Sequence, residues 1–149
     1  MLSCYKGTAQ PWFCDVMGHM NIRHFMAMFD ESSYQLLFQV FGWSGNPDNS
    51  GGQGWADVKH VIEYQAEVHA GDLLEVRACI SKVGTKSIGI RYEMINAVKN
   101  ELAATLDCVC VLIDLKTRKA VPLSAEQRDL ATQHLDPAWL LTGDEAREL

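Results

Sequence analysis

The segment from Ile22 to Phe41 constrains the fold most, because it predicts one long helix that is apolar on most sides. It contains no Gly or Pro, Asn21 before it is a good N-cap, and Gly42 stands where a glycine ends a helix. Apolar residues recur at helical spacing and also occupy the flanks: Ile22, Phe25, Met26, Phe29, Leu36, Leu37 and Val40, with Met28, Phe38 and Phe41 at the sides. Such a helix has to be covered around most of its circumference.

Strands in the remainder of the chain can supply that cover. Four segments between turns have the pattern of strands: His60–His69, Leu73–Val83, Lys86–Ala97 and Leu102–Leu115. The last is nearly all apolar, which predicts a central strand buried on both faces. Tyr5–Cys14 is predicted to be extended, with Pro11 indicating an edge or an end. Gly42–Gly54 is rich in glycine and is predicted to be a loop.

The C-terminal part predicts a second, shorter helix. Ser124 and Gln127 form a capping box of the type S-x-x-Q, which opens a helix through about His134. The order strand, long helix, loop, four strands in an antiparallel meander and short helix predicts an α+β fold with the long helix in the concave face of one curved sheet. We expect a single domain over residues 1–149, with a core of about 5–133 and a tail of 134–149.

Composition excludes some classes of binding partner and predicts the cellular compartment. The net charge of −6 argues against nucleic acid as the main partner, because phosphate binding needs a surplus of Lys and Arg on one face. Five cysteines and no secretory signal predict free thiols in a reducing compartment, so we expect a cytoplasmic protein. No apolar run reaches the length of a membrane span, and we expect no membrane partner.

The turn from Asp15 to Asn21 is the best candidate for chemistry. It places a carboxylate, the His19 imidazole and the Asn21 amide between a strand end and a helix start. Backbone N–H groups at a helix start stabilise negative charge on an oxygen, and a carboxylate beside them suits hydrolysis of an activated carbonyl. Taken one by one, the same residues also fit an ordinary turn aspartate, a histidine bonded to the backbone and an N-cap.

The motif Asp15-x-x-Gly18-His19-Met20-Asn21 resembles the D-x-x-G-H-[VM]-N signature of hotdog-fold thioesterases related to 4-hydroxybenzoyl-CoA thioesterase. Three later segments resemble the family as well, and the resemblance covers roughly residues 5–133. These segments are Glu63–Val76, with its Gly71-Asp72 turn, Val83–Ser87 and Arg118–Leu123.

The resemblance implies a five-stranded antiparallel sheet wrapped around one long central helix, with a short C-terminal helix. It also implies a homodimer or homotetramer with acyl-CoA sites between subunits. The family's catalytic aspartate falls on Asp15, as nucleophile or general base, and we expect His19 and Asn21 to assist it. Coenzyme A enters only as part of the substrate, and no other cofactor is implied. Expected substrate-binding residues are Gly18, Met20, Phe25, Tyr64, Lys82, Lys86 and Arg118, the last three as candidates for the CoA phosphates.

The chain differs from some family members at two positions, and two other functions are compatible with the resemblance. Many members have Tyr at the position of Phe25, and one subgroup has a second His at the position of Ile22. A non-catalytic acyl-CoA-binding dimer is the main alternative, and a hotdog dehydratase or hydratase fits the turn motif less well. Cys108 and Cys110 share a strand face without a His or Cys at metal spacing nearby, so we expect core packing there and no metal site.

Overall fold

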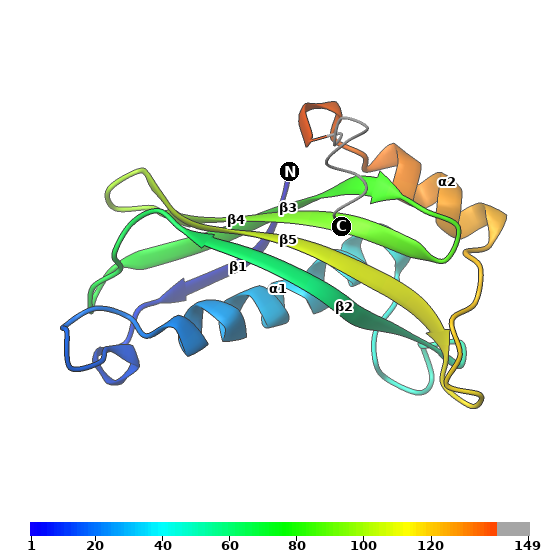
Figure 1. Cartoon of the computed structure of the whole chain (residues 1–149), viewed down its shortest axis with the longest axis horizontal. Coiled ribbons are helices and arrows are strands. Elements are labelled where there is room, and N and C mark those ends of the chain that lie inside the picture. The colour runs from blue at the N-terminus through cyan, green and yellow to red at the C-terminus, as the bar shows by residue number, and fades with distance from the viewer. Residues whose placement is uncertain (140–149) are drawn as a thin grey trace. The chain divides into compact units, whose positions relative to one another are not determined.

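The computed structural model describes residues 1–139, and its sheet contains five strands in the order β1-β3-β4-β5-β2 (Figure 1). The strands are β1 (Leu2–Thr8), β2 (Gln53–Tyr64), β3 (Leu73–Val83), β4 (Ser87–Asn96) and β5 (Glu101–Asp114). The helices are α1 (Ile22–Phe41) and α2 (Ala125–Gln133), with 3-10 turns η1 (Pro11–Phe13) and η2 (Pro137–Trp139). Residues 140–149, most of the expected tail, lie outside the described part. None of the described helices is long and apolar enough to cross a membrane.

The predicted element order is confirmed, but the predicted meander is wrong for the second strand. β3, β4 and β5 follow one another across the sheet, whereas β2 lies beside β5 and β1 lies beside β3. Antiparallel pairing of β1 with β3 runs from Leu2 opposite Ala78 to Thr8 opposite Leu73, with an irregularity between Ser3 and Tyr5. Turn spacing along the chain indicates where strands end, but it does not specify which strand becomes the neighbour of β2.

Two strand boundaries also differ from the sequence-based ones. β2 begins at Gln53, before the predicted start at His60. It ends at Tyr64 instead of His69, because the amides of Gln65 and Ala66 both donate to the Ala103 carbonyl and thereby interrupt the ladder. The predicted extended segment from Tyr5 ends early, since a 3-10 turn begins at Pro11, where proline is favoured. The bounds of α1 and β3 match the prediction.

The chain divides into two compact units, of which the first contains residues 1–36, 62–78 and 92–106. Its interior is built from the first part of α1 and from strand residues. The Phe29 ring packs edge-on against Tyr92 of β4 at 6.0 Å between centroids, and both side chains are almost fully buried. Residues that share this core are Phe25, Met28, Leu36, Val68, Leu74, Val76, Ala78, Met94, Ala103 and Leu106.

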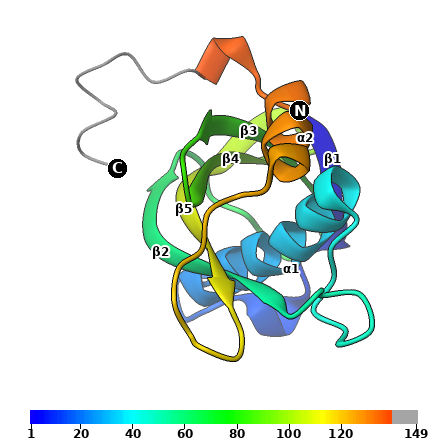
Figure 2. The same cartoon turned by 90° about the vertical axis from the view of Figure 1, so that its right-hand side faces the viewer.

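The second unit contains residues 37–61, 79–91 and, among the described residues, 107–139. Trp55 stacks on Phe41 at 5.0 Å between ring centroids, which ties the start of β2 to the end of α1. The predicted capping box is confirmed: Ser124 accepts from the Gln127 N–H, and the Gln127 side chain accepts from the Ser124 N–H. After α2 the chain runs beside β3, where Leu135 pairs with Ile80 (Figure 2).

Candidate active site

The turn between Cys14 and Asn21 is closed by backbone hydrogen bonds. Cys14 and Met20 form an antiparallel bridge, and the Asp15 N–H donates to the His19 carbonyl at 3.0 Å. The Gly18 N–H donates to the Asp15 carbonyl, also at 3.0 Å. Gly18 has a φ of +86°, a left-handed conformation that residues with a Cβ rarely adopt, so the turn requires glycine there. The turn therefore presents Asp15 and His19 from a constrained backbone.

Asn21 connects this turn to helix α1. Its side-chain oxygen accepts from the Arg23 N–H at 3.2 Å, which is the bond of an N-cap. Its side-chain NH2 group donates to Oδ2 of Asp15 at 3.3 Å. In one conformation, Asn21 can therefore both cap helix α1 and orient the turn.

The Asp15 carboxylate is held in its ionised form. The Met17 N–H donates to Oδ1 at 2.9 Å, and this bond contributes most to lowering the pKa of Asp15 below its usual value. The Asn21 bond and the nearby His19 lower the pKa further, while partial desolvation opposes them. An ionised carboxylate is the form that attacks a carbonyl or accepts a proton from water.

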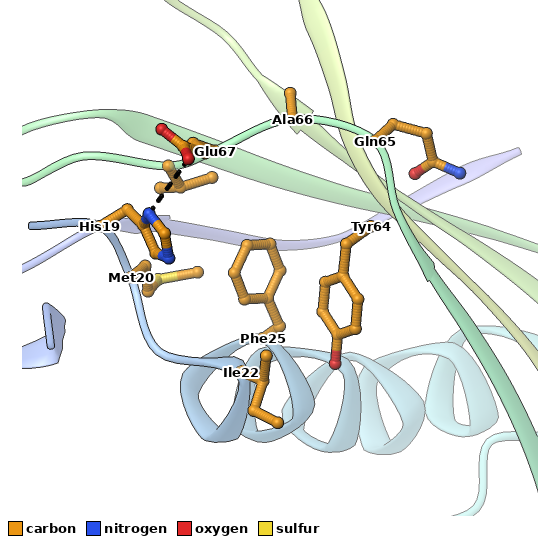
Figure 3. A pocket seen from close by; sticks show the side chains of 9 residues that line it. His19, Met20, Ile22, Phe25, Tyr64, Gln65, Ala66 and Glu67 are labelled. Atoms are coloured by element: carbon orange, nitrogen blue, oxygen red, sulfur yellow. Dashed lines mark ion pairs between the residues drawn. The ribbon is translucent and has the colours of Figure 1, made fainter. Parts of the chain in front are cut away.

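An apolar cavity of about 340 Å³ lies beside the turn (Figure 3). Phe25 stands in its wall, 4% exposed, with its ring edge-on to Tyr64 at 5.2 Å between centroids. The cavity is lined by His19, Met20, Ile22, Phe25, Tyr64, Gln65, Ala66, Glu67 and Val68. Mostly apolar walls with a few polar groups are typical of a small-molecule site.

Glu67 places a carboxylate beside His19 in the wall of this cavity. Its Oε1 lies 3.3 Å from Nδ1 of His19 (Figure 3). Its Oε2 lies 3.6 Å from Nε2 of His69. The His19 side chain is 23% exposed, so one side of its ring is available to the cavity. A carboxylate on Nδ1 fixes the orientation of the imidazole and leaves Nε2 for another partner.

The segment from Gln65 to Val68 is held against both the sheet and the turn. The Gln65 and Ala66 amides donate to the Ala103 carbonyl at 2.9 and 3.1 Å, as in a β-bulge. The Val68 carbonyl accepts from the Met20 N–H at 2.7 Å. This short connection therefore forms one wall of the cavity and also fixes the end of the turn.

The expected site residues fall into three groups. His19, Met20, Phe25 and Tyr64 line the cavity, and Asp15, Gly18 and Asn21 lie in the adjoining turn but not in the cavity wall. Lys82, Lys86 and Arg118 are exposed residues of the second unit and do not line this cavity. Their contact with CoA phosphates stays a prediction, as do the roles of the other residues.

The sequence does not indicate Gln65, Ala66, Glu67 and Val68 as site residues, because their alternating pattern predicts a regular strand. The sequence signal for Glu67 was weak: it is one of several polar residues that alternate along this segment. Nothing in that alternation indicates that the ladder breaks after Tyr64 and turns Glu67 toward His19.

Comparison with known families agrees with the motif. A family profile described as the thioesterase-like superfamily matches residues 9–130, most of the chain. The chain belongs to the thioesterase-like superfamily. Among curated proteins, no sequence matches it. The match includes the turn from Asp15 to Asn21 and all residues of the cavity wall.

Solved structures similar to this superfamily member share its fold. One is a 1,4-dihydroxy-2-naphthoyl-CoA thioesterase from Synechocystis, 23% identical, covering 86% of this chain and 93% of that one, with a TM-score of 0.73. A DHNA-CoA thioesterase from Staphylococcus aureus is 18% identical, and the match covers 89% of this chain and 91% of that one with a TM-score of 0.76. Another Staphylococcus aureus protein, solved in complex with CoA, is 16% identical, and the match covers 95% of this chain and 89% of that one with a TM-score of 0.79. The hotdog fold predicted from the sequence is thereby confirmed.

Proposed function

We propose that the protein hydrolyses an acyl-CoA thioester to the free acid and CoA, with Asp15 as the reacting carboxylate. One observation carries the proposal: the Asp15 carboxylate, which accepts hydrogen bonds from the Met17 N–H and the Asn21 amide, lies in the same turn as His19 and Met20, and these two residues line an apolar cavity. Similar solved structures named as acyl-CoA thioesterases, and one that holds CoA, support this substrate class.

The cavity suits the acyl part of such a substrate. Met20, Phe25 and Val68 are nearly fully buried in its wall and offer only apolar surface. The Ile22 amide stands at the first position of α1, and among the described residues it has no hydrogen-bond partner. We assign it as the donor to the carbonyl oxygen of the thioester, where the helix start favours negative charge.

Two routes of C–S cleavage fit this arrangement. In the first, an Asp15 oxygen bonds to the carbonyl carbon, CoA leaves as the thiolate, and water then cleaves the resulting anhydride. In the second, Asp15 accepts a proton from water, the hydroxide adds to the carbonyl carbon, and the departing CoA sulfur receives the proton. In both routes, His19 held by Glu67 orients the water or the thioester.

The assembly is part of the proposal. β2 is an edge strand of the sheet and exposes Val58, Val61 and Tyr64, so pairing of this edge with a second copy would cover apolar surface. We propose a homodimer or homotetramer of single-domain chains in the cytoplasm, with Lys82, Lys86 and Arg118 available for CoA phosphates. Light scattering on the purified chain measures the oligomeric state directly.

The experiment measures thiol release from acyl-CoAs with short, long, aromatic and betaine-type acyl groups. Asp15→Asn keeps the shape of the side chain and removes its charge, so it should lose at least about 100-fold in kcat/KM, or about 2.7 kcal/mol. The matched control is Asp48→Asn, which makes the same change at an exposed position in the loop after α1 and should leave the rate unchanged.

The outcomes separate the alternatives. Equal rates for Asp15→Asn and wild type would remove Asp15 from the mechanism. Binding of acyl-CoA without release from any thioester would favour the non-catalytic binding dimer, and addition of water to an enoyl-CoA would favour a hydratase. Single turnover in ¹⁸O-water tests the first route, because ¹⁸O enters the Asp15 carboxyl group only when water attacks the aspartyl carbonyl of the anhydride.

A further inference from the structure

Asp57, His60 and Cys108 form a compact cluster of metal-ligating atoms in the second unit. Asp57 and His60 belong to β2 and Cys108 to β5, and these strands are neighbours in the sheet (Figure 1). One ligand atom from each residue lies within 4.8 Å of the other two. The Asp57 Oδ2 and the His60 Nε2 are 2.9 Å apart, although strict alternation would point residues 57 and 60 to opposite faces.

A second thiol lies on the same strand. Cys108 and Cys110 occupy alternate positions of β5 and therefore share one face of that strand. Both thiols are almost completely buried, whereas the Asp57 carboxylate is also open to solvent. The cluster therefore combines a partly exposed carboxylate and imidazole with one buried thiol.

The cluster is accessible to an ion from solution. The side chains of His60 and Asp57 are 28% and 32% exposed, whereas Cys108 closes the inner side at 3% exposure. An ion held by these three residues would keep one position free for water. Three protein ligands with one open position is a common arrangement for zinc in proteins.

We infer that Asp57, His60 and Cys108 bind a divalent cation of the zinc class, with water as the fourth ligand. A thiolate, an imidazole and a carboxylate select a borderline-soft ion, whereas magnesium and calcium prefer oxygen ligands alone. On binding, the Cys108 thiol releases its proton to solvent, and the thiolate sulfur bonds to the metal. Cys110 remains a thiol.

The bound ion would link edge strand β2 to β5. Asp57 and His60 lie about 50 residues before Cys108 along the chain, and a metal that binds only the folded arrangement stabilises it. This site is separate from the proposed hydrolysis, since its residues do not line the cavity beside Asp15. Its test is therefore independent of thioesterase activity.

The test uses the whole chain, stripped with a chelator and dialysed, then titrated with Zn²⁺ in competition with a chromophoric indicator and, separately, with Co²⁺. We expect one equivalent bound per chain and a thiolate-to-cobalt charge-transfer band. Cys108→Ser should abolish the band, and His60→Gln should weaken Zn²⁺ binding at least about tenfold. Matched controls are Cys4→Ser and His69→Gln, which should bind as wild type does. Zn²⁺, but not Mg²⁺, should raise the Tm of wild type and leave that of Cys108→Ser unchanged.

Absence of the charge-transfer band in the wild type would overturn the proposal. So would equal Zn²⁺ affinity in wild type, Cys108→Ser and His60→Gln, because the ion would then bind elsewhere on the surface. If Cys108→Ser does not fold by circular dichroism, His60→Gln decides, since His60 is partly exposed and its replacement leaves no cavity. Loss of binding in the control variants to the same degree would also contradict the assignment.

Discussion

The side-chain amide of Asn21 bonds to Asp15 through its nitrogen while its oxygen caps helix α1. One residue thus performs two tasks that a substitution can separate. Asn21→Ser keeps a good N-cap but is too short to reach Asp15, whereas Asn21→Ala removes both bonds.

We expect the free energy of unfolding of Asn21→Ser to lie within about 0.5 kcal/mol of the wild-type value. For Asn21→Ala we expect it to be lower by about 1 kcal/mol. Both should lose several-fold in kcat/KM, because Asp15 is less well oriented in each. Urea titration and thiol-release kinetics measure the two effects. If the Ser variant kept full activity, the Asn21–Asp15 bond would have no part in hydrolysis.

The acid side of the rate profile should follow Asp15. Its pKa is lowered in the folded chain, first by the Met17 N–H and then by Asn21 and His19. A lowered carboxyl pKa means that the ionised group stabilises the fold above the unfolded pKa, and this contribution is lost as pH falls through the folded pKa. Activity that depends on Asp15 should therefore persist until the pH is below the usual titration range of aspartate.

The same carboxyl group should titrate at higher pH in Asn21→Ser, because one of the bonds that favour its charge is gone. The shift should be partial, since the Met17 bond remains. The ¹³C chemical shift of the Asp15 carboxyl carbon against pH measures it in both proteins. A downward shift in the variant would contradict this explanation.

Phe25→Ala should strongly destabilise the fold. The Phe25 side chain is 4% exposed and packs edge-on against Tyr64. Its truncation leaves a cavity and should lower the free energy of unfolding by about 3–5 kcal/mol. Phe38 is the matched control, because it is a phenylalanine on the same helix that is 55% exposed. Phe38→Ala should lose no more than about 1 kcal/mol in urea unfolding. Equal losses at the two positions would show that the wall of the cavity is not packed as described.

Ser124→Ala should lower the free energy of unfolding by about 1 kcal/mol, because it removes the side-chain acceptor of the capping box. Ser124→Asp keeps an acceptor at the N-cap and should stay close to wild type. Thermal unfolding followed by circular dichroism compares the two variants. A larger loss in the Asp variant than in the Ala variant would mean that the contribution of Ser124 lies elsewhere than in the cap.

The sequence predicts those parts of the fold that depend on local pattern. Helix α1 matches its predicted bounds because caps and apolar spacing agree there, and the Ser124 capping box forms as predicted. The Asp15–Asn21 turn was predicted from its residue types, and its hydrogen bonds explain why Gly18 and Asn21 are needed.

Long-range relationships could not be predicted in the same way. The partner of β2 depends on pairing across the sheet, and the Glu67–His19 contact depends on a ladder that breaks after Tyr64. The cluster of Asp57, His60 and Cys108 is not predicted for the same reason, because ligand spacing along the sequence does not indicate ligands that come from two different strands.

The Ala103 carbonyl accepts from both the Gln65 and the Ala66 N–H groups. The structure of this region therefore depends on the number of residues between Tyr64 and Val68. Removing one residue between Tyr64 and Val68 would shorten a segment that is bonded to the Ala103 carbonyl at one end and to the Met20 N–H at the other, so both sets of bonds could not be kept. The loop from Trp43 to Gly52 forms no part of the cavity wall. Natural variants of this chain should therefore tolerate insertions in that loop far more readily than between positions 64 and 68.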